Sequence, residues 1–102
     1  MYKLAALGAG ATPVAALETG LRADVDALLG RVTSRSRIVF IANPNNPTGT
    51  CITKNKFEKF LKRIPENVVV VVDEAYIEFV RDPACAMGLK FIDCGRPVVT
   101  LR

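Results

Sequence analysis

The sequence contains no histidine and no tryptophan, and its three cysteines, Cys51, Cys85 and Cys94, stand far apart. Because zinc sites combine histidine and cysteine at short spacings, this composition argues against a metal centre. Three unpaired cysteines are typical of free thiols in a reducing cytosol.

Long apolar runs are also missing. The longest aliphatic run, Val68–Val72, has five residues, whereas a membrane helix needs roughly 20. With no apolar leader at the start either, we expect a cytoplasmic protein that does not enter a membrane.

Aromatic residues make up only 7% of the chain, and the net charge is a mild +4. A nucleic-acid surface would combine a basic stripe with stacking aromatics, so we expect no nucleic-acid partner. A composition of 50% hydrophobic and 24% charged residues is typical of a globular protein. The length of 102 residues allows at most one domain.

Two apolar runs, Arg37–Ala42 and Val68–Val72, predict the strands of a buried sheet. Strands that are apolar on both faces are typical of parallel sheets covered by helices. Thr53 is a good helix N-cap. An apolar stripe at helical spacing follows it and ends at Pro65; its members are Phe57, Phe60, Leu61 and Ile64. Strand, helix and strand therefore form one βαβ unit, and the chain is predicted to be α/β.

The remaining elements are predicted from shorter patterns. These are a helix tail at Tyr2–Ala6, a weak strand at Thr12–Leu17, a helix at Val25–Val32 capped by Asp24, a short helix at Pro83–Leu89 and a last strand at Pro97–Leu101. Such apolar strands need partners on both sides and helices on both faces. We therefore expect residues 1–102 to be a piece of a larger domain.

Polar residues follow both predicted strands. The loop 43–50 contains Asn46, and Asp73 closes the second strand, with Tyr76 three residues later. Ligands of open α/β sheets bind outside the carboxyl ends of the strands, so these three residues are candidates for one binding site. Each has a simpler alternative: Asp73 as a helix cap or local ion pair, Tyr76 as a core tyrosine, and Asn46 as a turn residue that binds its own backbone.

The run Asn43-Pro44-Asn45-Asn46-Pro47-Thr48-Gly49, followed by Asp73-Glu74-Ala75-Tyr76-Ile77-Glu78-Phe79, resembles the aminotransferases of the fold-type I pyridoxal-phosphate architecture. Within that class the likeness is greatest to histidinol-phosphate aminotransferases. It covers essentially the whole chain. The resemblance implies that residues 1–102 are a fragment of the pyridoxal-phosphate-binding large domain, a mostly parallel sheet with flanking helices.

The resemblance also implies roles for the three candidate residues. Asp73 would pair with the protonated ring nitrogen of pyridoxal 5'-phosphate, and Asn46 and Tyr76 would hydrogen-bond the ring's 3′ oxygen. The lysine that forms the Schiff base is expected beyond Arg102, so no catalytic residue is assigned here and the fragment alone is expected to be inactive.

The reaction implied is amino-group transfer between histidinol phosphate, or its keto analogue imidazole acetol phosphate, and glutamate or 2-oxoglutarate, as in histidine biosynthesis. A small-molecule amino donor and a keto acid would be the partners, and the complete enzyme would be a homodimer. Two alternatives stay open: an enzyme like threonine-phosphate decarboxylase, and a truncated product without catalytic activity.

Overall fold

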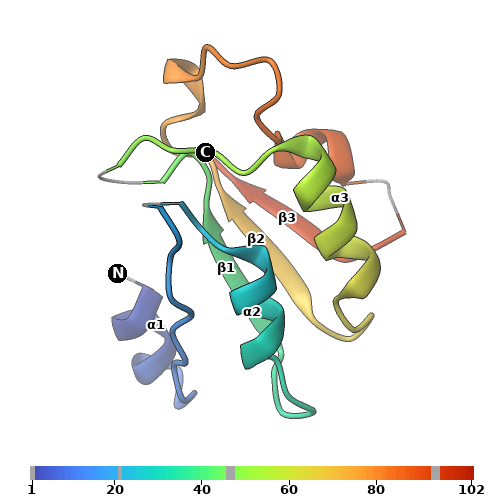
Figure 1. The fold of residues 1–102 in the computed structure, drawn as a ribbon. Helices are drawn as coiled ribbons and strands as arrows, with labels where there is room; N and C mark the ends of the chain where they lie inside the picture. Colours follow the sequence, from blue (N-terminus) through green and yellow to red (C-terminus); the bar gives the residue numbers. More distant parts are fainter. Residues whose placement is uncertain (1, 21, 46–47, 93–94) are drawn as a thin grey trace.

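Three parallel strands form one sheet in the order β1-β2-β3. The computed structural model describes residues 2–20, 22–45, 48–92 and 95–102. Its elements, shown in Figure 1, are α1 (Tyr2–Gly8), α2 (Val25–Arg31), β1 (Ile38–Ala42), α3 (Lys54–Arg63), β2 (Val69–Asp73), the 3₁₀ helices η1 (Ile77–Phe79) and η2 (Gly88–Phe91), and β3 (Val98–Leu101). The partial α/β sheet predicted from the apolar runs is confirmed.

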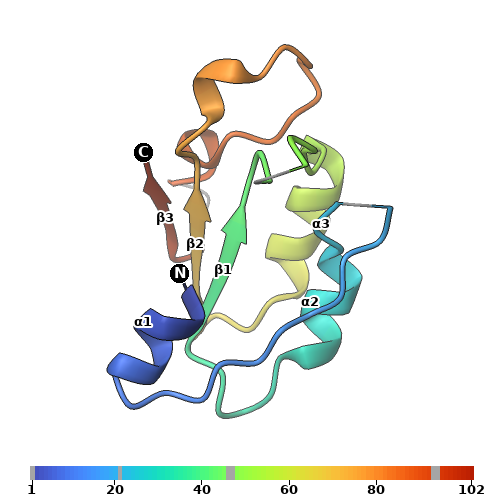
Figure 2. The same ribbon diagram turned by 90° about the vertical axis from the view of Figure 1, so that its left-hand side faces the viewer.

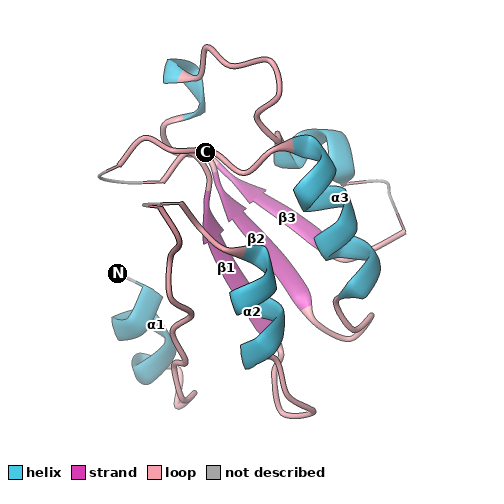
Figure 3. Cartoon of the chain, viewed as in Figure 1, coloured by secondary structure: helices cyan, strands magenta, loops and turns pink. Residues whose placement is uncertain are grey.

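The register brings the carboxyl ends of the three strands level with one another. Ala42 pairs with Asp73, and Asp73 pairs in turn with Leu101. In the described part of the chain, β1 is followed by a loop that leads into α3, and β2 is followed by a segment that contains the two 3₁₀ helices (Figure 3). The residues after each strand therefore share one edge of the sheet, as expected for a parallel arrangement.

The two faces of the sheet are covered by different helices. Helices α2 and α3 lie on one face and α1 on the other, which is clearest in Figure 2. Side chains alternate between the faces: Val39 and Ile41 join the core under α3, while Phe40 contacts Tyr2 of α1. The core is made by apolar residues of the strands and of α3; they include Phe57, Phe60, Leu61, Ile64, Val70, Val72 and Val98.

Side-chain caps start two of the helices, as the sequence predicts. The Asp24 carboxylate accepts hydrogen bonds from the amides of Asp26 and Ala27 at 3.0 Å each. The Thr53 hydroxyl accepts the amide of Lys56 at 3.4 Å. Each cap satisfies donors that the first helical turn leaves open. Both predicted helix starts are confirmed.

Two predicted elements are wrong. The segment Thr12–Leu17 forms no strand; Pro13 lacks a backbone donor, and Leu17 is 85% exposed. The segment Pro83–Leu89 is not a helix, because the backbone around Cys85 pairs with the residues that lead into α3. The Lys54 amide donates to the Ala84 carbonyl at 2.9 Å, and a 3₁₀ turn begins only at Gly88.

None of the helices within the described ranges has the length and apolar character that crossing a lipid bilayer requires.

The start of η2 packs closely against the ends of β2 and β3. A Cβ atom at Gly88 would lie 2.6 Å from Thr100 Oγ1, 3.2 Å from Val72 Cβ and 3.3 Å from Glu74 Oε1. The absence of a side chain at Gly88 is therefore a packing requirement.

We predict that Gly88→Ala destabilises the protein by about 1–3 kcal/mol, because the added methyl group overpacks a filled site. Gly30→Ala is the matched control. Gly30 lies in α2 with open space around a Cβ atom, so alanine there should stabilise by about 0.5–1 kcal/mol. Urea denaturation of the complete polypeptide that carries this chain measures both, and equal midpoints for the two variants would contradict the prediction.

Candidate functional site

The loop after β1 is anchored by the buried side chain of Asn43. Its amide group donates to the Ala86 carbonyl at 2.9 Å, and its oxygen accepts the Ile52 amide at 2.8 Å. The Asn43 backbone amide also donates to the Asp73 carbonyl at 2.9 Å. The two ends of the loop after β1, the end of β2 and the segment after η1 are thereby held together at the carboxyl edge of the sheet.

Asp73 ends β2 at this edge, and both of its carboxylate oxygens accept a hydrogen bond. Oδ1 accepts the Ala75 amide at 3.1 Å, and Oδ2 accepts the hydroxyl of Tyr2 at 2.5 Å. The Tyr2 ring is stacked on Phe40 of β1, with ring centroids 4.8 Å apart. The half-buried carboxylate is thus held by a local turn and by a residue 71 positions away in the sequence.

Tyr2 stays a neutral hydrogen-bond donor over the physiological pH range. Burial raises the pKa of its phenol far above the ordinary value, and the hydrogen bond to Asp73 and the charge of that carboxylate raise it further. A deprotonated phenol beside a carboxylate would place two negative charges together. The proton therefore stays on Tyr2, and Asp73 accepts it as a hydrogen bond.

Glu74, the next residue, points to the other side of the sheet and is 1% exposed. One of its oxygens accepts the Gly88 amide, and the other pairs with Arg102, whose Nη2 and Nε atoms lie 3.2 Å away. A buried carboxylate is costly without such partners. Glu74 therefore joins the end of β2 to η2 and to the residue after β3.

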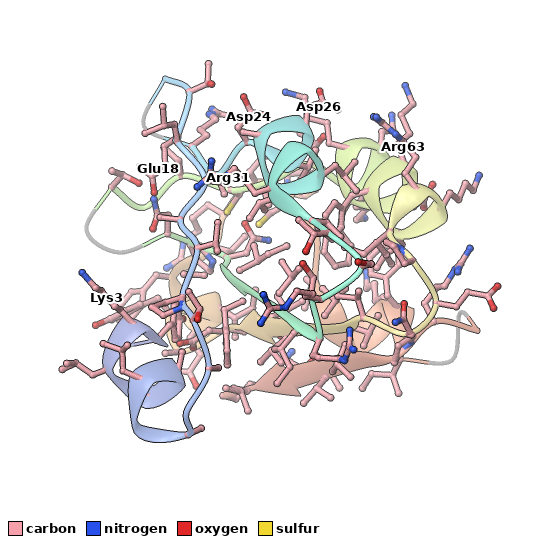
Figure 4. All side chains as sticks on the ribbon, turned by 90° about the horizontal axis from the view of Figure 1, so that it is seen from below. Lys3, Glu18, Asp24, Asp26, Arg31 and Arg63 are labelled. Carbon is pink, nitrogen blue, oxygen red and sulfur yellow. The ribbon has the colours of Figure 1, made fainter. Side chains whose placement is uncertain are left out.

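Tyr76 lies beside a cavity of about 390 Å³ at the same edge, a size within the range of small-molecule sites. The phenol is 46% exposed, so Tyr76 is not a core tyrosine. The described lining comes from the loop after β1 and from the segment after β2 that contains η1: Pro44, Asn45, Gly49, Cys51, Tyr76, Phe79, Val80, Arg81 and Asp82. Asn45 is held in this loop by a 2.8 Å hydrogen bond to Glu18, a residue that Figure 4 labels.

The structure brings part of the predicted site together. Asp73 and Tyr76 lie at the same edge of the sheet, although Asp73 is not among the described residues that line the cavity. Asn46 lies outside the described residues, so its predicted role stays a prediction. Sequence reasoning missed Tyr2 and Glu74. Asp73 and Glu74 are consecutive acids at the end of an apolar strand, and consecutive side chains face opposite sides of a sheet. This pattern could have indicated that Glu74 points away from Asp73. No local sequence signal indicates a role for Tyr2.

The described cysteines, Cys51 and Cys85, are free thiols, and Cys94 lies outside the described residues. Burial raises the pKa of the Cys85 thiol to about 12, with a further contribution from the Cys51 thiol beside it. Cys85 is therefore a protonated thiol near neutral pH. Among the described residues, no group of three or more metal-ligating side chains could hold a metal ion.

Comparison with known proteins identifies the family. Residues 1–101 match the sequence model of the family described as "Aminotransferase class I and II". The chain belongs to this family. A histidinol-phosphate aminotransferase from Sinorhizobium meliloti, solved in complex with pyridoxal-5'-phosphate, has the same fold. It matches with a TM-score of 0.82 at 28% identity, over 97% of this chain and 27% of that one.

Two curated family members carry different names. An aromatic amino acid aminotransferase from Cutibacterium acnes is 46% identical over 102 residues, which are 99% of this chain and 29% of that protein. A histidinol-phosphate aminotransferase from Zymomonas mobilis is 53% identical over 88 residues, or 86% of this chain and 24% of that protein. The chain thus spans less than a third of the length of these relatives.

We predict that Arg102→Met destabilises the protein by about 3–5 kcal/mol, because it leaves the Glu74 carboxylate buried without its cationic partner. Arg63→Met is the matched control. Arg63 pairs with Asp26 at 2.9 Å on the outer side of α2 and α3, where both side chains are mostly exposed (Figure 4). Losing an exposed pair should cost about 0.2–1 kcal/mol.

Urea denaturation of the complete polypeptide that carries this chain measures both changes. Similar losses for the two arginine variants would show that burial does not set the strength of the Glu74 ion pair.

Proposed function

We propose that this chain is the cofactor-binding part of a pyridoxal 5'-phosphate-dependent aminotransferase. The observation that carries the proposal is the position of Asp73: a half-buried carboxylate at the carboxyl end of a central parallel strand. Membership of the aminotransferase class I and II family supports it. The reaction class follows from the family, and the residue roles are proposed from the resemblance, with the position of Asp73 and Tyr76 at one edge of the sheet in support.

The residues present fit the cofactor. A carboxylate favours the protonated form of a cationic ring nitrogen, and a hydrogen bond between charged groups is about twice as strong as a neutral one. Asp73 would hold that nitrogen, and the Tyr76 hydroxyl, beside the cavity, would donate to the ring's 3′ oxygen. Asn46 would be a second donor to that oxygen. When bound, the protonated pyridine ring acts as an electron sink for the charge that develops at the substrate's α-carbon.

The proposed reaction passes an amino group between a small-molecule donor and a keto acid. We propose histidinol phosphate, or its keto analogue imidazole acetol phosphate, with glutamate or 2-oxoglutarate. The 53% identity to the Zymomonas mobilis relative supports this choice. A second candidate is transfer from aromatic amino acids, which the match to the Cutibacterium acnes relative over all but 1% of this chain favours. We further propose that the complete enzyme is cytoplasmic and works as a homodimer.

We predict that Asp73→Asn, in the complete polypeptide that carries this chain, lowers kcat by at least about a hundredfold. The amide keeps the shape of the side chain but removes the charge that would hold the ring nitrogen protonated. Steady-state kinetics with a saturating amino donor and cofactor measures the loss. Asp26→Asn, on the exposed side of α2, is the control and should keep the parent rate. A near-parent kcat for Asp73→Asn would rule out the proposed role.

The substrate is tested separately, and we predict that kcat/KM for histidinol phosphate exceeds that for phenylalanine by at least about tenfold. A site built for a phosphate group loses that interaction with phenylalanine, and ten times is about 1.4 kcal/mol of transition-state binding. Both substrates are measured with 2-oxoglutarate as acceptor. A preference for phenylalanine would favour the aromatic alternative while leaving the reaction class intact.

A further inference from the structure

The first helix contributes one polar contact to the candidate site, through Tyr2. Its hydroxyl donates to Asp73 Oδ2 at 2.5 Å, and the acceptor is the residue proposed to hold the ring nitrogen. Lys3, the next residue, is exposed and projects away from the sheet in Figure 4. The contact is therefore specific to one side chain of α1.

Two features fix the Tyr2 hydroxyl in place. Its ring lies nearly parallel to that of Phe40, at an interplanar angle of 11°, and stacked aromatic pairs are worth about 0.5–1.5 kcal/mol beyond their burial. Phe40 itself lies in β1, next to the strand that carries Asp73. The Tyr2 ring thus packs on β1, and Asp73 ends the neighbouring strand β2. The sheet therefore sets the distance between the hydroxyl and the carboxylate.

Two hydrogen bonds from within the protein hold the Asp73 carboxylate. The Ala75 amide binds Oδ1 from within the chain's own turn, while Tyr2 binds Oδ2 from a different layer. A carboxylate with a neutral donor on one oxygen is oriented and keeps its negative charge favoured. The hydrogen bond from Tyr2 therefore does more than attach α1 to the sheet, because it also orients the Asp73 carboxylate.

We propose that Tyr2 is a positioning residue that acts on the cofactor through Asp73: its hydroxyl orients the carboxylate and stabilises its charge, so that the ring nitrogen keeps its proton. This inference rests on the proposed function, because it requires Asp73 to face that nitrogen. The donor is always available, since burial and Asp73 keep the pKa of the phenol well above its ordinary value.

The test uses the complete polypeptide that carries this chain, loaded with pyridoxal 5'-phosphate labelled with ¹⁵N in the ring. The ¹⁵N chemical shift, followed against pH, reports the protonation of that nitrogen directly. Tyr2→Phe removes the hydroxyl and keeps the stacked ring. Without the hydroxyl the carboxylate is no longer held in place beside the nitrogen, so we expect the midpoint of the ring-nitrogen titration to fall, by up to about one pH unit. Lys3→Ala should give the parent curve.

A second substitution covers the case in which Tyr2→Phe does not fold. Tyr2→3-fluorotyrosine keeps the hydroxyl that orients the carboxylate, so the midpoint should stay close to the parent value. In the same samples, kcat should fall for Tyr2→Phe while KM for the amino donor stays within about twofold. A lower midpoint for Tyr2→Phe together with a parent midpoint for Tyr2→3-fluorotyrosine would distinguish positioning from a packing role.

Asp73→Asn separates this inference from the proposed function. If Asp73→Asn leaves the ring-nitrogen titration unchanged, Asp73 does not hold the nitrogen and the proposed function fails in its residue roles. If Asp73→Asn changes the titration but both Tyr2 substitutions give the parent midpoint, only the role of Tyr2 is overturned. A loss of stability in Tyr2→Phe with a parent midpoint would likewise assign Tyr2 to packing alone.

Discussion

The buried carboxylate of Glu74 is the interaction on which the carboxyl edge of the sheet depends. A charge that is 1% exposed must find partners within the protein, and the partners come from the start of η2 and from the residue after β3. Gly88 lies so close to Thr100, Val72 and the carboxylate that a side chain there would clash, first of all with the Thr100 hydroxyl. One charged group therefore fixes the relative positions of β2, η2 and the end of β3.

Two consecutive acids at the tip of β2 serve opposite faces of the sheet. Asp73 faces α1 and accepts the Tyr2 hydroxyl, whereas Glu74 faces η2 and Arg102. The alternation of side chains along a strand explains this division. The acid tied into the interior holds β2, η2 and Arg102 together, and the half-buried acid beside it lies at the carboxyl end of the strand, outside which ligands of open α/β sheets bind. Two neighbouring carboxylates thus have different environments.

Family membership and geometry answer different questions about this chain. The match to aminotransferase class I and II covers residues 1–101 and establishes the fold family. It does not select a substrate, because relatives with different names match the same residues. The fold places Asp73 and Tyr76 at one edge of the sheet, outside the carboxyl ends of the strands, where ligands of open α/β sheets bind.

The sequence by itself determined the elements whose signals are local. The β-branched runs around Ile38–Ala42 and Val69–Asp73, and the caps Asp24 and Thr53, fix strands and helix starts through contacts within a few residues. Only the tertiary structure decided that Tyr2 binds Asp73, that Glu74 binds Arg102, and that the backbone near Cys85 pairs with the start of α3 and so forms no helix. Those outcomes depend on which distant groups meet a buried donor or charge, and no local pattern records that.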